Sequence, residues 1–193
     1  MKKVIARIKG GLGNQFFCYA AARRLALANK AELVIDDESG FTRDTQYQRT
    51  YQLDHFSIQA RKATPLERLE PFERYRRWIM TKISSTKPFC ERMYIKQESI
   101  EYEPRLLNLE VENTVYLDGY WQSEGYFKDV EHSIREDFQV LPPVDKLDLH
   151  IASHICNRET VAVHVRWFDN PDNDKTVHNV SRDYYQCAME LVE

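Results

Sequence analysis

A glycine-rich segment at residues 10–15, with the sequence GGLGNQ, is the first pattern in the chain that could bind a ligand. Glycines let a backbone approach a ligand closely, and the free N–H groups at the start of a helix attract an anion such as a phosphate. Asn14 and Gln15 add neutral hydrogen-bonding groups at the same point. The pattern indicates a phosphate site, although a turn without a ligand explains these glycines equally well.

The same glycines partly fit the dinucleotide-binding pattern G-x-G-x-x-G. Gly11 and Gly13 fill its first two positions, and Asp36 follows at a spacing suited to a ribose contact. Phe16 stands where close packing of helix on strand requires the third glycine. A P-loop is excluded because no Lys-Ser/Thr pair follows the glycines. A Rossmann-type nucleotide site with Gly11, Gly13 and Asp36 is therefore kept as an alternative.

A second pattern, His164-Val165-Arg166 followed by Asp169, lies at the carboxyl end of an apolar run at residues 161–165. Ligands of open α/β sheets bind beyond the carboxyl ends of the strands. Arg166 is placed there to bind a phosphate, and His164 to form a hydrogen bond with it. The alternative is a buried His164 and an ion pair between Arg166 and Asp169.

A third pattern mixes aromatic and amide side chains at a strand–helix turn, in Tyr120, Trp121 and Gln122. Such a surface suits a sugar, whose apolar face stacks on rings while its hydroxyl groups take hydrogen bonds. Burial of the tryptophan in the core is the commoner alternative.

Two patterns that resemble metal sites are better explained otherwise. Asp172 and Asp174 form a D-x-D pair, but the asparagines and proline around them favour a turn. His150 and His154 share a helix face, but Ile151 stands where a zinc protease has its glutamate. We predict no metal site and no cofactor.

The elements that position these residues follow from hydrophobic periodicity. The β-branched run at residues 4–8 predicts a strand, and the apolar spacing at 16–29 predicts a helix capped by Asn14 or Gln15. A second strand at 33–35 completes a βαβ unit, which implies a parallel sheet with a right-handed crossover. Further elements are a helix from Thr64 to Ser84, a strand at 115–118, a helix at 124–138 capped by Ser123, a helix at 144–156, a strand at 161–165 and a helix from Ser181 onward.

Composition narrows the function classes. The 193 residues are 42% hydrophobic and 30% charged with a formal net charge of −3, which is ordinary for a globular protein. Residues 61–92 hold nine Lys or Arg and four Asp or Glu, whereas residues 93–193 hold nine and twenty. A nucleic-acid binder would not carry so acidic a larger half, so nucleic acid is not expected as a partner.

The cysteines and the apolar segments bear on localisation. Cys18, Cys90, Cys156 and Cys187 lack zinc spacing, and we expect four reduced and mostly buried thiols in a cytoplasmic protein. No window approaches the roughly 18 apolar residues of a membrane span, and charges come too early for a signal peptide.

The motifs, in this order, resemble those of the α-1,2-fucosyltransferases of glycosyltransferase family 11. The likeness extends over nearly the whole chain, and the first two motifs are the most specific. They are Gly-Gly-Leu-Gly-Asn-Gln-Phe-Phe at 10–17, Leu-Asp-Gly-Tyr-Trp-Gln-Ser at 117–123, His-Val-Arg at 164–166 with Asp169, and Ser-Arg-Asp-Tyr-Tyr at 181–185; residues 41–44 and 51–54 also fit.

The resemblance implies a GT-B-like fold and the inverting, metal-independent transfer of L-fucose from GDP-fucose to the 2-hydroxyl of a galactoside. It assigns Arg166 and His164 to the donor diphosphate and nominates Asp169 as the base. The glycine-rich loop, with Gly11, Gly13, Asn14 and Gln15, would line the donor side of the cleft. The acceptor would meet Tyr120, Trp121 and Gln122. Trp167 departs from the family pattern, which has a second arginine there.

The resemblance also implies a domain organisation. Residues 1–145 would form an acceptor-side α/β domain with a parallel sheet, and residues 146–193 a linker helix and the first strand, loop and helix of a second, Rossmann-like donor domain. The rest of a donor domain does not follow Glu193, so we expect a truncated chain. Bacterial relatives of this type build surface polysaccharide such as lipopolysaccharide O-antigen, and the chain resembles them in having no N-terminal anchor.

Two further hypotheses stay open at the sequence level. One is a glycan- or nucleotide-binding α/β fragment without catalysis of its own. The other concerns the basic segment near residues 64–84, which could contact the inner membrane peripherally, although a solvated helix with Glu67, Glu70 and Glu73 explains it too. The oligomeric state is not encoded in any recognisable pattern.

Overall fold

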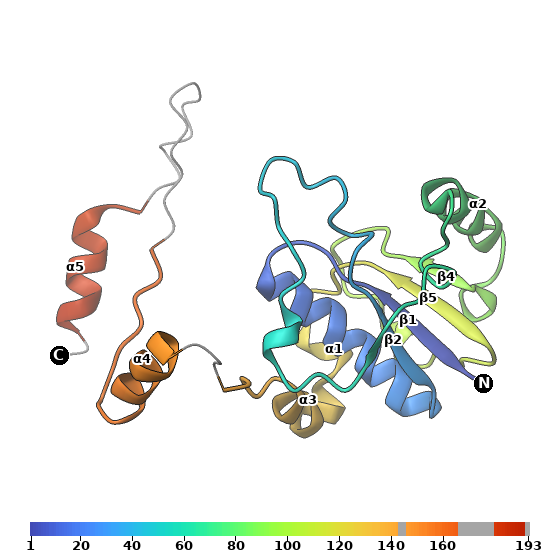
Figure 1. Ribbon diagram of the computed structural model, residues 1–193. Coiled ribbons are helices and arrows are strands. Elements are labelled where there is room, and N and C mark those ends of the chain that lie inside the picture. The colour runs from blue at the N-terminus through green and yellow to red at the C-terminus, as the bar shows by residue number, and fades with distance from the viewer. Residues whose placement is uncertain (143–145, 166–179, 192–193) are drawn as a thin grey trace. The chain divides into compact units, whose positions relative to one another are not determined.

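The computed structural model of the protein describes residues 1–142, 146–165 and 180–191. The chain divides into two compact units, Met1–Leu141 and Pro142–Glu193, and each is described by itself. The first unit is an α/β domain built on one sheet (Figure 1). The functional roles predicted for residues 1–145 and 146–193 stay predictions.

The sheet of the first unit has five strands in the order β3-β2-β1-β5-β4. All four pairings are parallel, which confirms the expected parallel sheet and gives a Rossmann-like order. In the register of the three central strands, Ala6 pairs with Ile35 on one side and with Leu117 on the other. The strands are β1 Lys3–Arg7, β2 Glu32–Asp36, β3 Arg61–Lys62, β4 Tyr94–Lys96 and β5 Thr114–Asp118.

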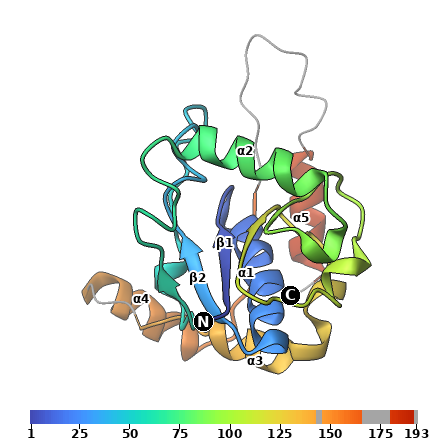
Figure 2. The same cartoon turned by 90° about the vertical axis from the view of Figure 1, so that its right-hand side faces the viewer.

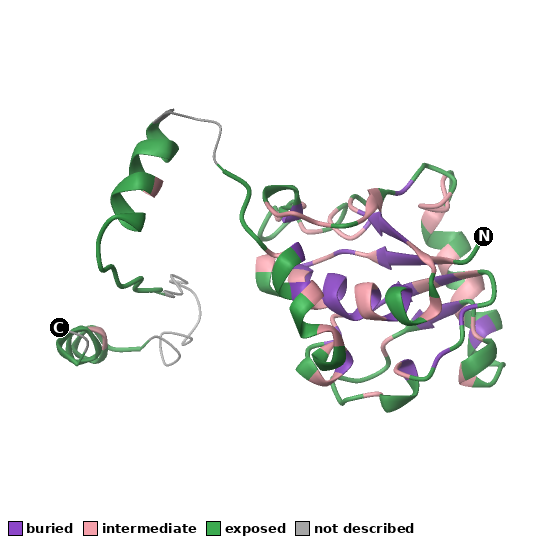
Figure 3. Cartoon of the chain, turned by 90° about the horizontal axis from the view of Figure 1, so that it is seen from below, coloured by how far each residue is buried: buried purple, intermediate pink, exposed green. Residues whose placement is uncertain are grey.

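Alternation along β1 separates two layers. Val4 and Ala6 pack in the main core with helix α1 (Leu12–Asn29), whereas Ile5 belongs to a small second cluster with Val34. Helix α2 (Glu73–Ser85) crosses above the strands in Figure 2. Figure 3 shows that the buried residues concentrate on the strands and on α1. The core therefore lies on the α1 face of the sheet.

Helix α1 begins earlier than its periodicity predicts. Gly11 is the N-cap and no side chain caps the helix, so the prediction of a cap at Asn14 or Gln15 is wrong. Both residues lie in the first helical turns instead. An alanine-rich helix needs little capping here because its buried alanines let it pack closely on the sheet.

Helix α2 begins at Glu73, not at Thr64 as predicted. Thr64 does start a turn, in which its backbone N–H donates to a Glu67 Oε at 3.0 Å. Pro71 ends the helical path because proline lacks an N–H and disfavours the helical conformation in the residue before it. Phe72 then adopts a left-handed conformation with φ 68° before the helix starts.

The helix predicted at residues 124–138 is broken into three pieces. Ser123 caps the first, as expected, with its hydroxyl accepting from the Gly125 N–H at 3.2 Å. The path bends at Phe127, where φ is −143°, and Tyr126 turns into the core. The pieces are the 3-10 turns Glu124–Tyr126 and Lys128–Val130 and helix α3, Glu131–Asp137; other 3-10 turns are Leu53–His55, Phe89–Glu91 and Pro104–Leu106.

The second unit contains helices α4 (Lys146–Cys156) and α5 (Arg182–Glu190), which confirms both helices predicted there. Ser181 caps α5 by accepting from the Tyr184 N–H at 3.2 Å. The strand predicted at residues 161–165 is wrong, because these residues are exposed and have no regular secondary structure. A β-branched run forms a strand only beside a partner, and the described part of this unit contains none.

The structure corrects the expectation that the cysteines are mostly buried, since only Cys18 is buried while Cys90, Cys156 and Cys187 are exposed. Burial raises the pKa of Cys18 to about 12, so its thiolate is scarce. We expect Ellman's reagent to modify three thiols quickly in the folded protein at mildly alkaline pH and the fourth only after unfolding. Four fast thiols in the folded protein would contradict the burial of Cys18.

Within the described ranges, no helix combines the length and apolarity needed to cross a membrane.

Candidate functional site at the carboxyl edge of the sheet

The carboxyl ends of the parallel strands bring together most of the predicted site residues of the first unit. β1 leads into Lys9 and the glycine-rich loop, and β5 ends at Asp118 and leads into Tyr120. Because the strands are parallel, these segments meet at one edge of the sheet, where α/β proteins bind their ligands.

The three glycines of the loop differ in how much space a side chain would find at each position. Gly10 has φ +80°, and a Cβ there would lie 2.8 Å from Nδ2 of Asn14 and 3.0 Å from a ring carbon of Tyr120. A Cβ on Gly11 would meet only Nε of Arg49, at 3.9 Å, and one on Gly13 would meet nothing within 4 Å. The fold thus requires glycine at position 10, whereas it leaves open space over Gly11 and Gly13.

Gln15 is fully buried, and all its hydrogen bonds go to the backbone of the chain. Its Nε2 donates to the carbonyl oxygens of Gly10 at 3.0 Å and Thr50 at 2.9 Å, and its Oε1 accepts from the Gln52 N–H at 2.9 Å. A direct contact with a sugar donor does not fit this residue. Gln15 instead ties the glycine-rich loop to residues 50–52.

Asn14 connects the predicted donor loop to the predicted acceptor segment. Its Oδ1 accepts a hydrogen bond of 2.7 Å from Nε2 of Gln122, a residue 108 positions away in the sequence. Gln122 is exposed and Asn14 half-buried, so both amides lie at the surface of the site. The structure brings these two predicted residues together.

Tyr120 and Trp121 differ in exposure. Trp121 is 2% exposed and packs edge-on against Tyr126, so its ring has no free face for stacking on a sugar. Tyr120 is half-buried, and Nζ of Lys9 lies 5.0 Å from its ring centroid. Of these two rings, that of Tyr120 is therefore the one that is accessible for stacking on a sugar.

Gln97, which directly follows β4, shapes the turn that carries these rings. Its Oε1 accepts from the N–H groups of Tyr120 at 2.8 Å and Trp121 at 3.1 Å. Trp121 has a left-handed φ of 54°, a strained value for a bulky residue. The side chain of Gln97 thus holds the backbone in this conformation.

Asp118 anchors the positive charges beneath the loop. Its carboxylate lies 2.7 Å from Nζ of Lys9 and 3.2 Å from a guanidinium nitrogen of Arg7, and accepts from the Tyr94 hydroxyl at 2.8 Å. Burial alone would raise the pKa of Asp118, but Lys9 and Arg7 outweigh it and hold the pKa below its usual value of 3.8. Asp118 is therefore ionised and a weak base, suited to positioning.

A shallow pocket opens beside the loop, and it is lined in part by residues that the sequence motifs did not identify as ligand-binding. Arg49 pairs with Asp44 at 3.3 Å and lies over the Tyr47 ring at 4.0 Å. Arg43 is exposed and has no ion pair within the described part of the chain. The pocket is lined by Lys9, Gly10, Gly40, Arg43, Asp44, Thr45, Gln46, Tyr47, Arg49 and Tyr120. Positive charge beside tyrosine rings suits a ligand with both anionic and sugar groups.

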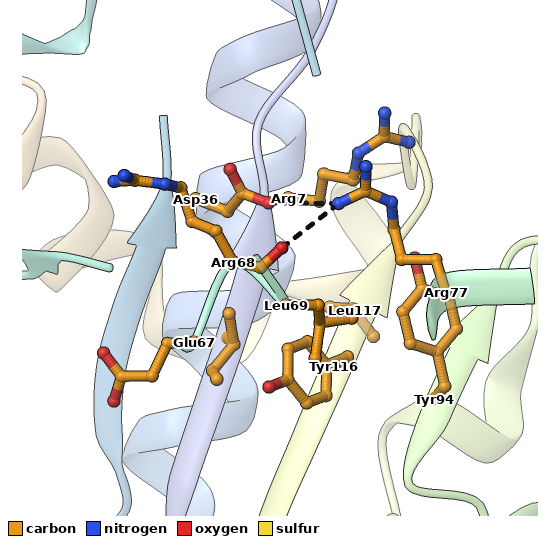
Figure 4. A pocket seen from close by; sticks show the side chains of 10 residues that line it. Arg7, Asp36, Glu67, Arg68, Leu69, Arg77, Tyr94, Tyr116 and Leu117 are labelled. Atoms are coloured by element: carbon orange, nitrogen blue, oxygen red, sulfur yellow. Dashed lines mark hydrogen bonds and ion pairs between the residues drawn. The ribbon is translucent and has the colours of Figure 1, made fainter. Parts of the chain in front are cut away.

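The dinucleotide alternative is weakened by the environment of Asp36. The carboxylate is buried, accepts from the Ser39 N–H at 2.9 Å and from its hydroxyl, and lies 3.9 Å from Arg77. Figure 4 shows Asp36 facing Arg77 of α2 in a small cavity that Arg7 and Tyr94 also line. Oxygens already engaged in this way do not suit a ribose contact.

The remaining predicted site residues lie in or near the second unit. His164 is exposed in a segment without regular structure. Arg166 and Asp169 lie outside the described residues, as do Trp167 and the pair Asp172 and Asp174. Among the described residues, no three His, Cys, Asp or Glu side chains gather closely enough to bind a metal ion.

Comparison with known proteins connects the chain to an enzyme family. No protein-family model matches the chain, and no solved structure matches it either. An O-antigen biosynthesis glycosyltransferase, WbnK of Escherichia coli, is 30% identical in an alignment of 203 positions that covers 96% of this chain and 67% of the relative. The chain belongs to the O-antigen glycosyltransferases.

A second relative of this glycosyltransferase is an alpha-1,2-colitosyltransferase of Escherichia coli. It is 26% identical over 189 residues, covering 96% of this chain and 62% of the relative. The chain thus spans about two thirds of the length of the curated relatives it matches. As a glycosyltransferase of O-antigen synthesis, the protein would bind a sugar donor and an acceptor.

Proposed function

We propose that the protein takes part in the inverting, metal-independent transfer of L-fucose from GDP-fucose to the 2-hydroxyl of a galactoside. The observation that supports this most is the 2.7 Å hydrogen bond between Gln122 and Asn14, because it joins the segments assigned to acceptor and donor. The relative that transfers colitose through an α-1,2 linkage supports the linkage. Membership of the O-antigen glycosyltransferases supports the reaction class.

In this reaction, the acceptor oxygen forms a bond to the anomeric carbon of the sugar while the bond to the GDP oxygen breaks. The hydroxyl proton leaves to a base, for which Asp169 is our candidate. The open backbone over Gly11 and Gly13 can admit the diphosphate at the start of α1, where N–H groups stabilise the charge of the leaving group. We assign Arg166 and His164 to the same diphosphate.

The acceptor would rest on Tyr120, with Gln122 forming hydrogen bonds to its hydroxyl groups. Tyr120, which is half-buried and lines the shallow pocket, and the exposed Gln122 support this placement. Residues 1–145 would then act as the acceptor-side domain and residues 146–193 as the beginning of the donor side. We also include peripheral contact of the protein with the membrane and a cytoplasmic location in the proposal.

Colitose is the second candidate for the transferred sugar, because one relative carries its name. The decisive assay measures GDP release by the complete product of the gene with GDP-fucose and, separately, GDP-colitose. A β-galactoside and its 2-deoxy analogue serve as acceptors. Release that needs GDP-fucose and the 2-hydroxyl supports the proposal. Release only with GDP-colitose would overturn the proposal that GDP-fucose is the donor. Binding of a galactoside without turnover would favour a glycan-binding role.

The link between the two segments gives a prediction for the same assay. Replacing Gln122 by alanine is expected to lower kcat/KM about tenfold, the value of one hydrogen bond of about 1.4 kcal/mol. Gln139→Ala is the matched control, because this exposed amide only donates to the Arg135 carbonyl oxygen, at 3.2 Å. Equal activity of the two variants would exclude Gln122 from the site.

A further inference from the structure

Helix α2 and Phe72, the residue directly before it, expose large apolar side chains to solvent. Phe72, Tyr75, Trp78 and Ile83 are 73%, 63%, 58% and 55% exposed. The rings of Tyr75 and Trp78 stack with centroids 6.1 Å apart. Single exposed apolar residues are ordinary, but several within one short segment, two of them stacked on each other, indicate an interaction surface.

The helix is attached to the sheet through polar contacts rather than through these aromatic rings. Ser84 is its only buried residue, and the Ser84 hydroxyl accepts from the Tyr94 N–H at 3.0 Å. Arg77 points inward, 3.9 Å from Asp36 and 3.7 Å from Glu73. The aromatic residues are thus not needed for the core of the first unit.

Positive charges surround the exposed rings. Arg74, Arg76 and Lys82 are exposed on the same helix. Arg76 donates to the Glu70 carbonyl oxygen at 3.2 Å, and Arg74 and Lys82 have no ion pair with any described residue. The acidic residue of the helix, Glu73, faces Arg77. The outward face of α2 is therefore aromatic and cationic, and no carboxylate of the described residues forms an ion pair with these three cations.

We propose that the outward face of α2 binds the surface of an anionic phospholipid membrane. Aromatic rings settle at the level of the lipid headgroups, and Lys and Arg attract anionic lipids. Aromatic residues and arginine are also enriched at protein interfaces, so a second copy of the chain is the competing occupant that the experiment below distinguishes. The helix is too short to cross the bilayer, so it would lie along the surface. The inference rests on the peripheral membrane contact included in the proposed function and assigns that contact to a surface, and it does not depend on which sugar the enzyme transfers.

Vesicle sedimentation of the full chain tests this proposal. We expect binding to phosphatidylcholine vesicles that contain about one third phosphatidylglycerol, weak binding to phosphatidylcholine alone, and loss of binding at high ionic strength. Each basic residue contributes roughly fivefold to partitioning. The triple variant Arg74→Gln, Arg76→Gln, Lys82→Gln should therefore bind roughly a hundredfold more weakly.

A matched triple variant removes three exposed charges outside α2, namely Lys2→Gln, Lys128→Gln and Arg135→Gln. It should bind more than tenfold better than the α2 variant. Anionic vesicles should also shift the tryptophan emission of the wild type to shorter wavelength, and Trp78→Phe should abolish that shift. Equal binding of the two triple variants would overturn the proposal, as would equal binding to both kinds of vesicle. So would dimerisation of the wild type through α2, seen by sedimentation velocity, without vesicle binding.

Discussion

Replacing Gly40 by alanine is expected to destabilise the first unit by about 3 kcal/mol or more. A Cβ at this position would lie 2.9 Å from the carbonyl carbon of Ile8 and 2.9 Å from Cβ of Lys9, and still closer to the Ile8 carbonyl oxygen. Two of these atoms belong to backbone that continues β1, so no flexible side chain can move away. The clash must displace the loop between β1 and the glycine-rich segment.

Gly13→Ala is the matched control for this prediction. A Cβ at position 13 meets nothing within 4 Å, and the residue lies inside α1. Alanine in a helix is favoured over glycine by about 0.5–1 kcal/mol, so this variant should be stabilised. Urea unfolding followed by circular dichroism measures both. A Gly40→Ala variant as stable as the wild type would show that the loop does not approach residue 40 as closely as described.

Replacing Asp118 by alanine is expected to cost about 3 kcal/mol of unfolding free energy. The substitution leaves Lys9 and Arg7, both mostly buried, without their carboxylate, and removes the acceptor of the Tyr94 hydroxyl. Removing one partner of a buried charge cluster is costly because the remaining charges stay desolvated. The loss should appear as a lower midpoint in urea unfolding.

Asp129→Ala provides the comparison with an exposed ion pair. Asp129 pairs with Arg24 at 2.7 Å, but its side chain is 54% exposed. Water and salt screen such pairs, so the expected loss is below about 1 kcal/mol. If Asp118→Ala and Asp129→Ala lost comparable unfolding free energy, the cluster of Asp118 with Arg7, Lys9 and Tyr94 would not have the structural importance described.

The same cluster predicts the pH dependence of stability. The pKa of Asp118 in the folded protein lies below its usual value of 3.8, so the folded state favours the ionised form. Its contribution is therefore complete above that value and is lost as the pH falls below it towards the folded pKa. Acid unfolding of the wild type should be steeper than that of Asp118→Ala over this range.

The βαβ unit at the start of the chain could be predicted because its signals are local. The apolar run of β1, the alanine spacing of α1 and the run of β2 each fit within a few residues. β3 and β4 have two and three residues and are too short for a period to be recognised. Pro71 marked the late start of α2, but the cap at Thr64 gave the stronger signal.

The candidate site could be predicted in part. The glycine-rich loop and the segment around Tyr120 were visible as residue patterns, but their meeting depends on β1 and β5 being neighbours in the sheet. No local pattern encodes that order, so the roles of Lys9 and Gln97 were missed. The burial of Gln15 and Trp121 could not be predicted either, because the residue type alone does not distinguish a buried amide or ring from an exposed one.

Gln97, which directly follows the edge strand β4, controls the backbone of residues more than 20 positions away in the sequence. Its side chain, rather than a neighbouring strand, sets the backbone at Tyr120 and Trp121. A substitution at residue 97 can therefore tilt the Tyr120 ring while that tyrosine itself is unchanged. With the acceptor placed on Tyr120 as proposed, sugar preference could change during evolution through a substitution at residue 97, and two relatives with identical contact residues could present different surfaces.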